Sequence, residues 1–254
     1  VRWLVGYKNH AKVALVVRRD GEFLRRFVHV GTGNYNARSG EQYTDLSLFS
    51  SDEIIANDVS HLFNDLTGLS EPPRRASQSL LVAPHHLLPG VIERIEREAA
   101  IARAGRPASI TAKLNGLSDP DVVRALYRAS QDGVEIDLVV RGICTLTPGV
   151  RGRSERIRVR SVVGRFLEHS RIYRFGNGDD PAYFIGSADL RPRNLRRRVE
   201  LLVPVSNPEH RARLDSILDL YANDPTAWVL DAGGEYAQEP RDGVSAQAVL
   251  MGRA

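Results

Sequence analysis

One arrangement of polar residues occurs twice in this sequence and constrains its fold more than any other feature. Each copy has a histidine two residues before a cation, then a glycine-led polar turn, an arginine and an acid. The first copy is His10, Lys12, Gly31-Thr-Gly-Asn34, Arg38 and Asp45. The second copy is His169, Arg171, Gly186-Ser-Ala-Asp189, Arg193 and Glu200. In both copies the arginine lies seven residues after the first glycine and the acid fourteen residues after it. This shared spacing indicates two related half-sites.

The pairing of a histidine with a cation favours chemistry on phosphoryl groups. An imidazole ring supplies a nucleophile, and a nearby positive charge offsets the charge of the phosphate oxygens. Side chains alternate along a strand with a period of two, so a strand would place each histidine and its cation on the same face. We therefore take His10, Lys12, His169 and Arg171 as candidate catalytic residues.

Size and composition are those of a protein with a substantial hydrophobic core. The chain has 254 residues, of which 42% are hydrophobic, and this length is typical of one or two domains. Cys144 is the only cysteine, which excludes a disulfide within the chain and a cysteine-rich metal site, and favours a reducing, cytoplasmic setting. No apolar run approaches the ~20 residues of a transmembrane helix, and the first residues are too short for a signal sequence.

The net charge of +4 is modest, but the arginines are unevenly distributed. Arg156, Arg158 and Arg160 alternate with apolar residues, and a second group lies at 191–198. As a strand, the first segment would align three guanidinium groups on one face, which suits a polyanion because the guanidinium fork matches phosphate oxygens. A solvated face that keeps the protein soluble is the alternative. Because both groups flank the second histidine motif, we favour the polyanion surface.

Periodicity and turn signals predict an α/β fold. A strand–helix–strand unit is expected over 109–140, because two apolar strands there flank an amphipathic helix, and such a unit implies a parallel pair of strands. A buried strand at 11–18 and a returning strand at 23–30 are expected to form a hairpin. The polar, proline-rich stretch at 67–77 indicates a domain boundary.

The domain organisation follows from these signals. We expect a partial first domain at 1–77, a complete second domain at 78–231 and a loose tail at 232–254, where glycine, alanine and polar residues dominate. The second histidine motif is preceded by a full strand–helix–strand unit, whereas the first is not. If the halves are homologous, the fold is a mixed sheet flanked by helices, in one partial and one complete copy.

Several segments around the two motifs are distinctive. They are Lys8-Asn-His-Ala-Lys12, His29-Val-Gly-Thr-Gly-Asn-Tyr-Asn36, Tyr43-Thr-Asp45, Val140-Arg-Gly-Ile-Cys144, Pro148-Gly-Val150, Val163-Gly-Arg-Phe-Leu-Glu-His-Ser-Arg171 and Ser187-Ala-Asp189. In combination they resemble the polyphosphate kinases that form a phosphohistidine and have two phospholipase-D-like catalytic domains. The resemblance covers about residues 5 to 230 and is to the C-terminal portion of that family.

The resemblance implies an enzyme that transfers the γ-phosphate of ATP to the end of an inorganic polyphosphate chain, reversibly. His10 then corresponds to the histidine that becomes phosphorylated, and Tyr43, Arg141 and His169 correspond to residues that contact the nucleotide. The implied partners are ATP or ADP and polyphosphate, without nucleic acid, and a homo-oligomer is compatible with the family. Mg²⁺ is the implied cofactor. The family's two magnesium-associated arginines precede the region matched here, so we assign no metal ligand in this chain.

The same reading gives each polar residue a role. Lys12 and Arg171 would neutralise charge on the transferred phosphate, because phosphoryl transfer depends mainly on positioning and charge. His169 would exchange a proton at the bridging oxygen, since imidazole titrates near neutral pH. Asp45 and Glu200 are candidates to orient the two rings by accepting a ring N–H.

Two other functions are open at this point. A phospholipase-D-like phosphodiesterase would use the same paired histidines on a phosphodiester, although Arg171, in place of a second lysine, and Tyr43-Thr-Asp45 argue against it. A truncated, non-catalytic pair of domains would bind polyphosphate or nucleotide without turnover. Both enzymatic functions, the kinase and the phosphodiesterase, require the two histidines to lie close together in one cationic pocket.

Overall fold

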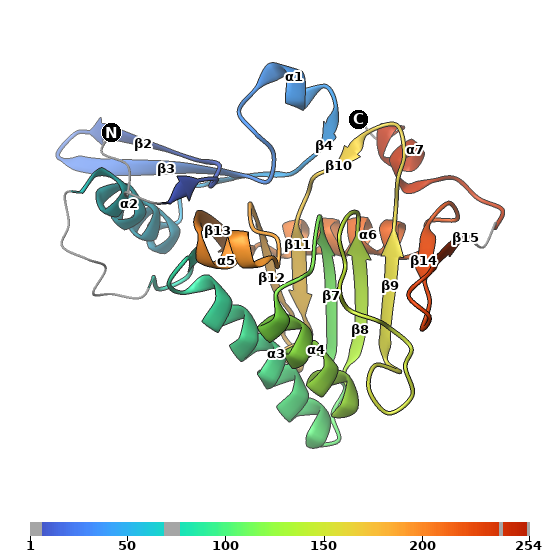
Figure 1. The fold of residues 1–254 in the computed structure, drawn as a ribbon. Coiled ribbons are helices and arrows are strands. Elements are labelled where there is room, and N and C mark those ends of the chain that lie inside the picture. The colour runs from blue at the N-terminus through green and yellow to red at the C-terminus, as the bar shows by residue number, and fades with distance from the viewer. Residues whose placement is uncertain (1–6, 69–76, 239–240, 253–254) are drawn as a thin grey trace.

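The computed structural model describes residues 7–68, 77–238 and 241–252 (Figure 1). Within these residues, a mixed sheet of ten strands has the order β1-β13-β12-β11-β7-β8-β9-β14-β15, with β6 also paired to β13. The strands are β1 (Lys8–Asn9), β6 (Leu81–Ala83), β7 (Ser109–Leu114), β8 (Glu135–Val140), β9 (Ile157–Ser161), β11 (Ile172–Phe175), β12 (Ala182–Gly186), β13 (Arg198–Pro204), β14 (Trp228–Leu230) and β15 (Tyr236–Gln238). The mixed sheet expected from the sequence is confirmed.

Helices cover both faces of this sheet. α3 (Leu87–Arg103) and α4 (Pro120–Gln131) pack on one face, and α6 (Pro208–Ala222) lies on the other (Figure 1). α4 begins where the Asp119 side chain caps two backbone amides, and its apolar side is buried. β7, α4 and β8 form the predicted strand–helix–strand unit with parallel strands. None of the helices described is both long and apolar enough to cross a bilayer.

The N-terminal residues form a smaller sheet beside the large one. Its strands are β2 (Val13–Asp20), β3 (Phe23–Gly31) and β5 (Ser47–Ser50). A short helix, α1 (Ala37–Gly40), follows β3, and α2 (Glu53–Thr67) packs against the β2–β3 hairpin. The hairpin is as predicted, but the predicted burial of its first strand is wrong, because Val16 and Val17 are 58% and 51% exposed. Burial depends on what packs against a strand, which an apolar run does not encode.

The repeat seen in the sequence extends to the secondary structure. β3 ends at Gly31 and β12 ends at Gly186, 155 residues later. α2 and α6 also begin 155 residues apart, and each has 15 residues. Thr32 and Ser187, which follow the two glycines, each accept a backbone amide from fourteen residues further on, at 2.8 and 3.3 Å. The two halves are therefore structural copies from these glycines onward.

The local structure at the two histidine motifs differs from the prediction. His10 to Lys12 lie between β1 and β2, and His169 to Arg171 lie between β10 (Leu167–Glu168) and β11. Each motif is thus a link between a two-residue strand and a longer one. The continuous strands predicted there are wrong, because the chain changes strand partner at each histidine: β1 pairs with β13 and β2 with β3, whereas β10 pairs with β4 (Tyr43–Thr44) and β11 with β7 and β12.

The C-terminal residues also differ from the expected loose tail at 232–254. The described part of this segment contains β15, which pairs with β14, and α7 (Ala246–Met251), which Ser245 caps. α7 lies beside β10 (Figure 1), and its Ala246 and Gln247 are buried. Gly234 lies in the turn between β14 and β15 with a φ of +89°, a backbone conformation that favours glycine.

Candidate active site

Most of the predicted catalytic and nucleotide-binding residues lie at one edge of the large sheet. β7 and β8 are parallel and end at this edge, where Asn115 and Arg141 follow them. β12 ends at the same edge with Gly186, and β13 begins there, two residues before Glu200. The carboxyl ends of parallel strands are where open α/β sheets bind ligands.

The two halves interlock at this edge through two short parallel pairings. β1 pairs with β13, which places the first histidine motif beside the strand of Glu200. β10 pairs with β4, which places the second motif beside the first half. The amide of His10 donates to the Val199 carbonyl at 2.9 Å, and the amide of His169 donates to the Thr44 carbonyl at 3.0 Å. Each histidine is therefore placed by the other half of the chain.

His10 is held by the acid of the second copy. Its Nδ1 lies 2.9 Å from Oε2 of Glu200, which is fully buried. Glu200 also accepts hydrogen bonds from Ser187 Oγ at 2.5 Å and Asn194 Nδ2 at 2.6 Å, so three side chains fix its orientation. A carboxylate at Nδ1 favours the tautomer with its proton there and leaves Nε2 as the nucleophilic nitrogen. The His10 side chain is 21% exposed, so a substrate has access to it.

Lys12 is buried beside this pair. Its Nζ donates to the backbone oxygen of His10 at 2.6 Å. Burial lowers the pKa of Lys12 to about 8, while the charge of Glu200 opposes this and that of Arg171 adds to it. A phosphate next to Lys12 would favour its charged form.

Arg171 ties the two halves together. Its Nε and Nη2 each lie 3.2 Å from the carboxylate of Asp189. Its Nη1 donates to the backbone oxygens of Thr32 at 3.2 Å and His169 at 2.6 Å. Asp189 also accepts the backbone amide of Asn115 at 2.8 Å. The donors of Arg171 already bind protein acceptors, so its guanidinium is not free to bind a phosphate through two parallel hydrogen bonds. Its main contribution to the site is positive charge.

The ring of His169 lies against Arg171 and Tyr43. Arg171 Nη1 is 3.0 Å from Nδ1 and 3.3 Å from Nε2, and the Tyr43 ring is stacked on it with the centroids 4.7 Å apart. Burial, then the charges of Arg171 and Lys12, lowers the pKa of His169 to about 3, and His10 contributes to the same effect. The two rings therefore share one cationic environment. His169 is neutral at pH 7 and a proton acceptor, not a group that titrates near neutral pH.

Arg141, which the resemblance assigns to the nucleotide, follows β8 at the site edge. Burial lowers the pKa of its guanidinium, and the charge of Asp189 raises it. Its Nε is buried and has no hydrogen-bond partner among the described residues. An unpaired buried donor is costly, so an anionic ligand at this edge would supply the missing acceptor.

Asp45 makes no hydrogen bond to His169 in the described structure. Its carboxylate packs against Gly33, where an added Cβ would lie 1.7 Å from Asp45 Oδ2. Burial raises the pKa of Asp45, and the charge of His29 lowers it. The prediction that each acid binds a histidine ring is therefore met at Glu200 alone among the contacts described.

Sequence reasoning missed the residues beneath the second histidine. Lys113 and Glu168 are both buried, and Lys113 Nζ lies 2.7 Å from Glu168 Oε2. The available signal was a lysine inside the apolar strand β7, since a fully buried lysine usually has a partner. Asp189 belongs to the repeated motif, but its pairing with Arg171 follows only from the fold.

The alternating arginines form ion pairs with acids of the neighbouring strand. β9 lies beside β8, whose two acids face the three arginines of this segment. Arg156 pairs with Glu135, and both Arg158 and Arg160 pair with Asp137, at 2.8 and 3.3 Å. These ion pairs weaken the case for a polyanion surface at this segment, which stays a prediction. The partner strand could not be read from the arginines themselves.

The described residues do not fit a magnesium ion by themselves. The buried carboxylates at the site, Glu200, Asp189 and Glu168, are each bound to a histidine or a cation. Among the described residues, no group of three or more His, Cys, Asp or Glu side chains is arranged to hold a metal. Mg²⁺ requires several oxygen ligands in near-octahedral geometry, which these paired groups do not offer.

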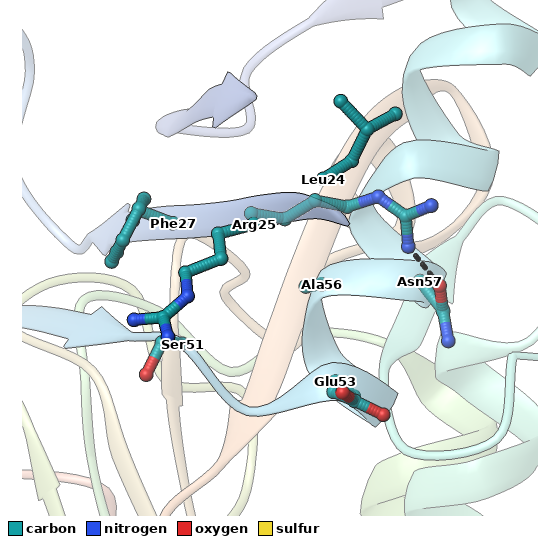
Figure 2. A pocket seen from close by; sticks show the side chains of 8 residues that line it. Leu24, Arg25, Phe27, Ser51, Glu53, Ala56 and Asn57 are labelled. Atoms are coloured by element: carbon teal, nitrogen blue, oxygen red, sulfur yellow. Dashed lines mark hydrogen bonds between the residues drawn. The ribbon is translucent and has the colours of Figure 1, made fainter. Parts of the chain in front are cut away.

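A hollow of about 540 Å³ lies between β3 and the start of α2 (Figure 2). It is lined by Leu24, Arg25, Arg26, Phe27, Ser51, Glu53, Ala56 and Asn57. Within this lining, Arg26 donates a hydrogen bond to the side chain of Asn57. None of these residues belongs to either histidine motif, so this hollow is separate from the candidate active site.

The fold and the site define a class of protein: an α/β chain in which two histidine half-sites lie over one edge of a mixed sheet flanked by helices. The solved structure of phosphatidylserine synthase from Haemophilus influenzae Rd KW20 is similar in fold, with a TM-score of 0.53 at 13% identity, over 89% of this chain and 66% of that chain. At this identity the likeness concerns the fold alone.

Comparison with known families identifies the chain further. The model of polyphosphate kinase C-terminal domain 1 matches residues 2–72, and that of C-terminal domain 2 matches residues 80–248. The chain belongs to the polyphosphate kinase family. The resemblance found in the sequence is thereby confirmed.

Individual relatives agree with this assignment. The polyphosphate kinase of Xylella fastidiosa (strain Temecula1) is 52% identical over 254 residues, which is 98% of this chain and 36% of that protein. That of Streptomyces coelicolor is 52% identical over 240 residues, 94% of this chain and 32% of that protein. The crystal structure of polyphosphate kinase from Porphyromonas gingivalis has a TM-score of 0.90 at 38% identity, over 98% of this chain and 40% of that chain. The chain thus spans about a third of the length of the curated relatives.

Proposed function

We propose that this chain performs the phosphoryl transfer of a polyphosphate kinase, from ATP through a phosphohistidine at His10 to the end of an inorganic polyphosphate chain, and in reverse. The observation that carries the proposal is the contact of His10 Nδ1 with Glu200 at 2.9 Å, because it leaves Nε2 as the nucleophile. In this proposal residues 1–77 and 78–231 contribute one histidine each to a single site.

In the first step, Nε2 of His10 attacks the γ-phosphorus in line. The new N–P bond forms as the bond from the γ-phosphorus to the bridging oxygen breaks, and ADP leaves with that oxygen. Glu200 keeps the hydrogen bond of the Nδ1 proton and stabilises the positive charge that the ring develops. Lys12 and Arg171 offset the charge of the phosphoryl oxygens.

In the second step, a terminal phosphate oxygen of polyphosphate attacks the phosphorus on His10. The O–P bond forms, the N–P bond breaks, and the electron pair returns to Nε2. His169 is neutral at pH 7 without ligand. The negative charge of the bound phosphates favours its protonated form, which lets the ring accept a proton from the attacking phosphate when that phosphate arrives protonated. Splitting the transfer lets one site receive two anionic substrates in turn.

Tyr43, Arg141 and His169 are proposed to contact the nucleotide. The unpaired buried Nε of Arg141 supports an anionic ligand at this edge, and Tyr43 offers an aromatic ring beside His169. Mg²⁺ is proposed as the companion of ATP, where it would neutralise phosphate charge. No step above is assigned to it, because the described residues do not fit it. A cytoplasmic setting, where ATP is available, completes the proposal.

Incubation with γ-labelled ATP tests this function. We expect an acid-labile, base-stable phosphoprotein that is absent in His10→Ala. The matched control is His61→Ala, which removes an exposed histidine on α2 and should label as the wild type does. Label retained in His10→Ala would remove the nucleophile assignment. An unlabelled wild type that still binds polyphosphate would favour the non-catalytic alternative.

A further inference from the structure

The second histidine motif rests on a buried polar cluster that the proposed mechanism does not use. His169 and Arg171 contact each other, whereas the alternate residues Glu168 and Ser170 both contact Lys113. Lys113, on β7, lies beneath both of them: its Nζ is 2.7 Å from Ser170 Oγ and 2.7 Å from Glu168 Oε2. Lys113 and Glu168 are each 2% exposed. This ion pair therefore lies under the backbone that carries the two functional side chains.

Both carboxylate oxygens of Glu168 are engaged by more than one donor. Oε2 accepts a hydrogen bond from Thr44 Oγ1 at 2.7 Å in addition to its contact with Lys113. Oε1 accepts hydrogen bonds from the Tyr221 hydroxyl at 2.9 Å and from Gln247 Nε2 at 2.6 Å. These donors come from β4, β7, α6 and α7. One carboxylate thus joins both halves of the chain and its last described helix.

Gln247 also holds the backbone just before the histidine. Its Oε1 accepts the amide of Phe166 at 3.0 Å, and its Nε2 donates to the Phe166 carbonyl at 2.9 Å. The approach is close, because a Cβ at Gly164 would lie 2.6 Å from Gln247 Oε1. Figure 1 shows α7 beside β10, in agreement with these bonds. The position of α7 is therefore coupled to a segment three residues before His169.

Among the contacts of the described residues, the first histidine motif shows no counterpart of this cluster. Asn9 and Ala11 stand beside His10 where Glu168 and Ser170 stand beside His169. The side chain of Asn9 accepts the amide of Ala11 at 3.1 Å, a local contact. Burying an ion pair costs desolvation energy that the attraction of the two charges often fails to exceed. Since the same motif is built without such a pair in the first half, the pair is not a requirement of the fold at this position.

We propose that Lys113, Glu168 and Gln247 are positioning residues that fix the segment from His169 to Arg171 and so set the phosphate-binding geometry of the second half-site. His10 is held independently by Glu200. The proposal rests on the proposed function only for the identity of the ligand, a chain of phosphates. Loosening the cluster displaces the His169 ring and the Arg171 charge while the His10 ring keeps its partner.

The test uses the whole 254-residue chain with two variants, Gln247→Ala and Glu168→Gln. The matched control is Gln238→Ala, because Gln238 is an exposed glutamine on β15 whose Nε2 donates to the Thr226 carbonyl at 2.8 Å, outside the cluster. Nitrogen-15 NMR follows the imidazole signals, and titration with tripolyphosphate gives Kd. We expect both variants to shift the His169 signals and raise Kd about tenfold, the loss of one charge-assisted hydrogen bond. The His10 signals and the control should match the wild type.

Unchanged His169 signals and an unchanged Kd in folded variants would overturn the positioning role. Equal shifts of the His10 and His169 signals would overturn the independence of the two half-sites. If Gln247→Ala does not fold, the Glu168→Gln variant tests the positioning role. Glutamine keeps the size of the side chain and can still accept hydrogen bonds. Labelling of His10 by ATP in the wild type is scored separately, so failure of the proposed function leaves the NMR result standing.

Discussion

Replacing Glu200 with glutamine tests the proposed chemistry most directly. Glutamine keeps the size of the side chain and an oxygen for the His10 ring, but it removes the negative charge now 2.9 Å from Nδ1. As Nε2 attacks phosphorus, the ring becomes positive. A carboxylate at about 4 Å from that charge contributes roughly 4 kcal/mol at an effective dielectric constant near 20. That energy corresponds to about 1,000-fold in rate, and a neutral hydrogen bond retains part of it, so we expect a loss of about 100- to 1,000-fold.

The assay is single-turnover phosphorylation by γ-labelled ATP, quenched in base, with circular dichroism to check folding. Glu98→Gln is the matched control. Glu98 is also fully buried, and it accepts the amides of Ser109 and Asn177, but it lies at the end of β7 opposite the site. We expect the control to phosphorylate at the wild-type rate. A folded Glu200→Gln protein within about threefold of the wild-type rate would refute the role of the charge at Nδ1.

Burial and close packing lead to three further expected outcomes. The pKa of His169 is about 3 in the folded chain against an ordinary value of 6.5, so its contribution to stability is full above pH 6.5 and is lost as the pH falls toward 3. The melting temperature should therefore fall less steeply in His169→Gln than in the wild type between about pH 7 and pH 4.5, and equal slopes would contradict this. Lys12, with a pKa of about 8, is charged below that pH, so calorimetry should find weaker tripolyphosphate binding as the pH rises through 8. A pH dependence that survives in Lys12→Met would count against this assignment. Gly186→Ala places a Cβ 2.1 Å from the Leu201 carbonyl and should reduce the free energy of unfolding by about 3 kcal/mol in urea titrations. Gly40→Ala, which meets nothing within 4 Å, is its control, and equal stability of the two variants would speak against the close packing.

Local signals were sufficient for the elements of the second half. The predicted strand, helix and strand over 109–140 appear as β7, α4 and β8 with ends within about one residue. Asp119 caps the helix and Gly133, with a φ of +105°, ends the turn after it. Helix caps and turn residues act on the backbone next to them, so they can be recognised in the sequence without knowing which elements pack together.

The pairings at the site were less accessible. The sequence identified Glu200 as a candidate to orient a ring, but not which ring, and it is His10, 190 positions away, that the carboxylate binds. The cluster of Lys113, Glu168 and Gln247 had no recognisable spacing, because its members come from three separate elements. The alternating arginines at 156–160 gave no sign that acids of β8 pair with them.

By itself, the sequence determined that the chain contains two related histidine half-sites, the strand–helix–strand unit over 109–140 and the family to which the chain belongs, because repeated spacing and periodicity are properties of the chain read in order. Only the tertiary structure decided that each motif pairs with the opposite half, that His169 is kept neutral and that the C-terminal helix reaches the site. These features depend on strand order and on the burial of charges, which arise when residues far apart in the chain are brought into contact.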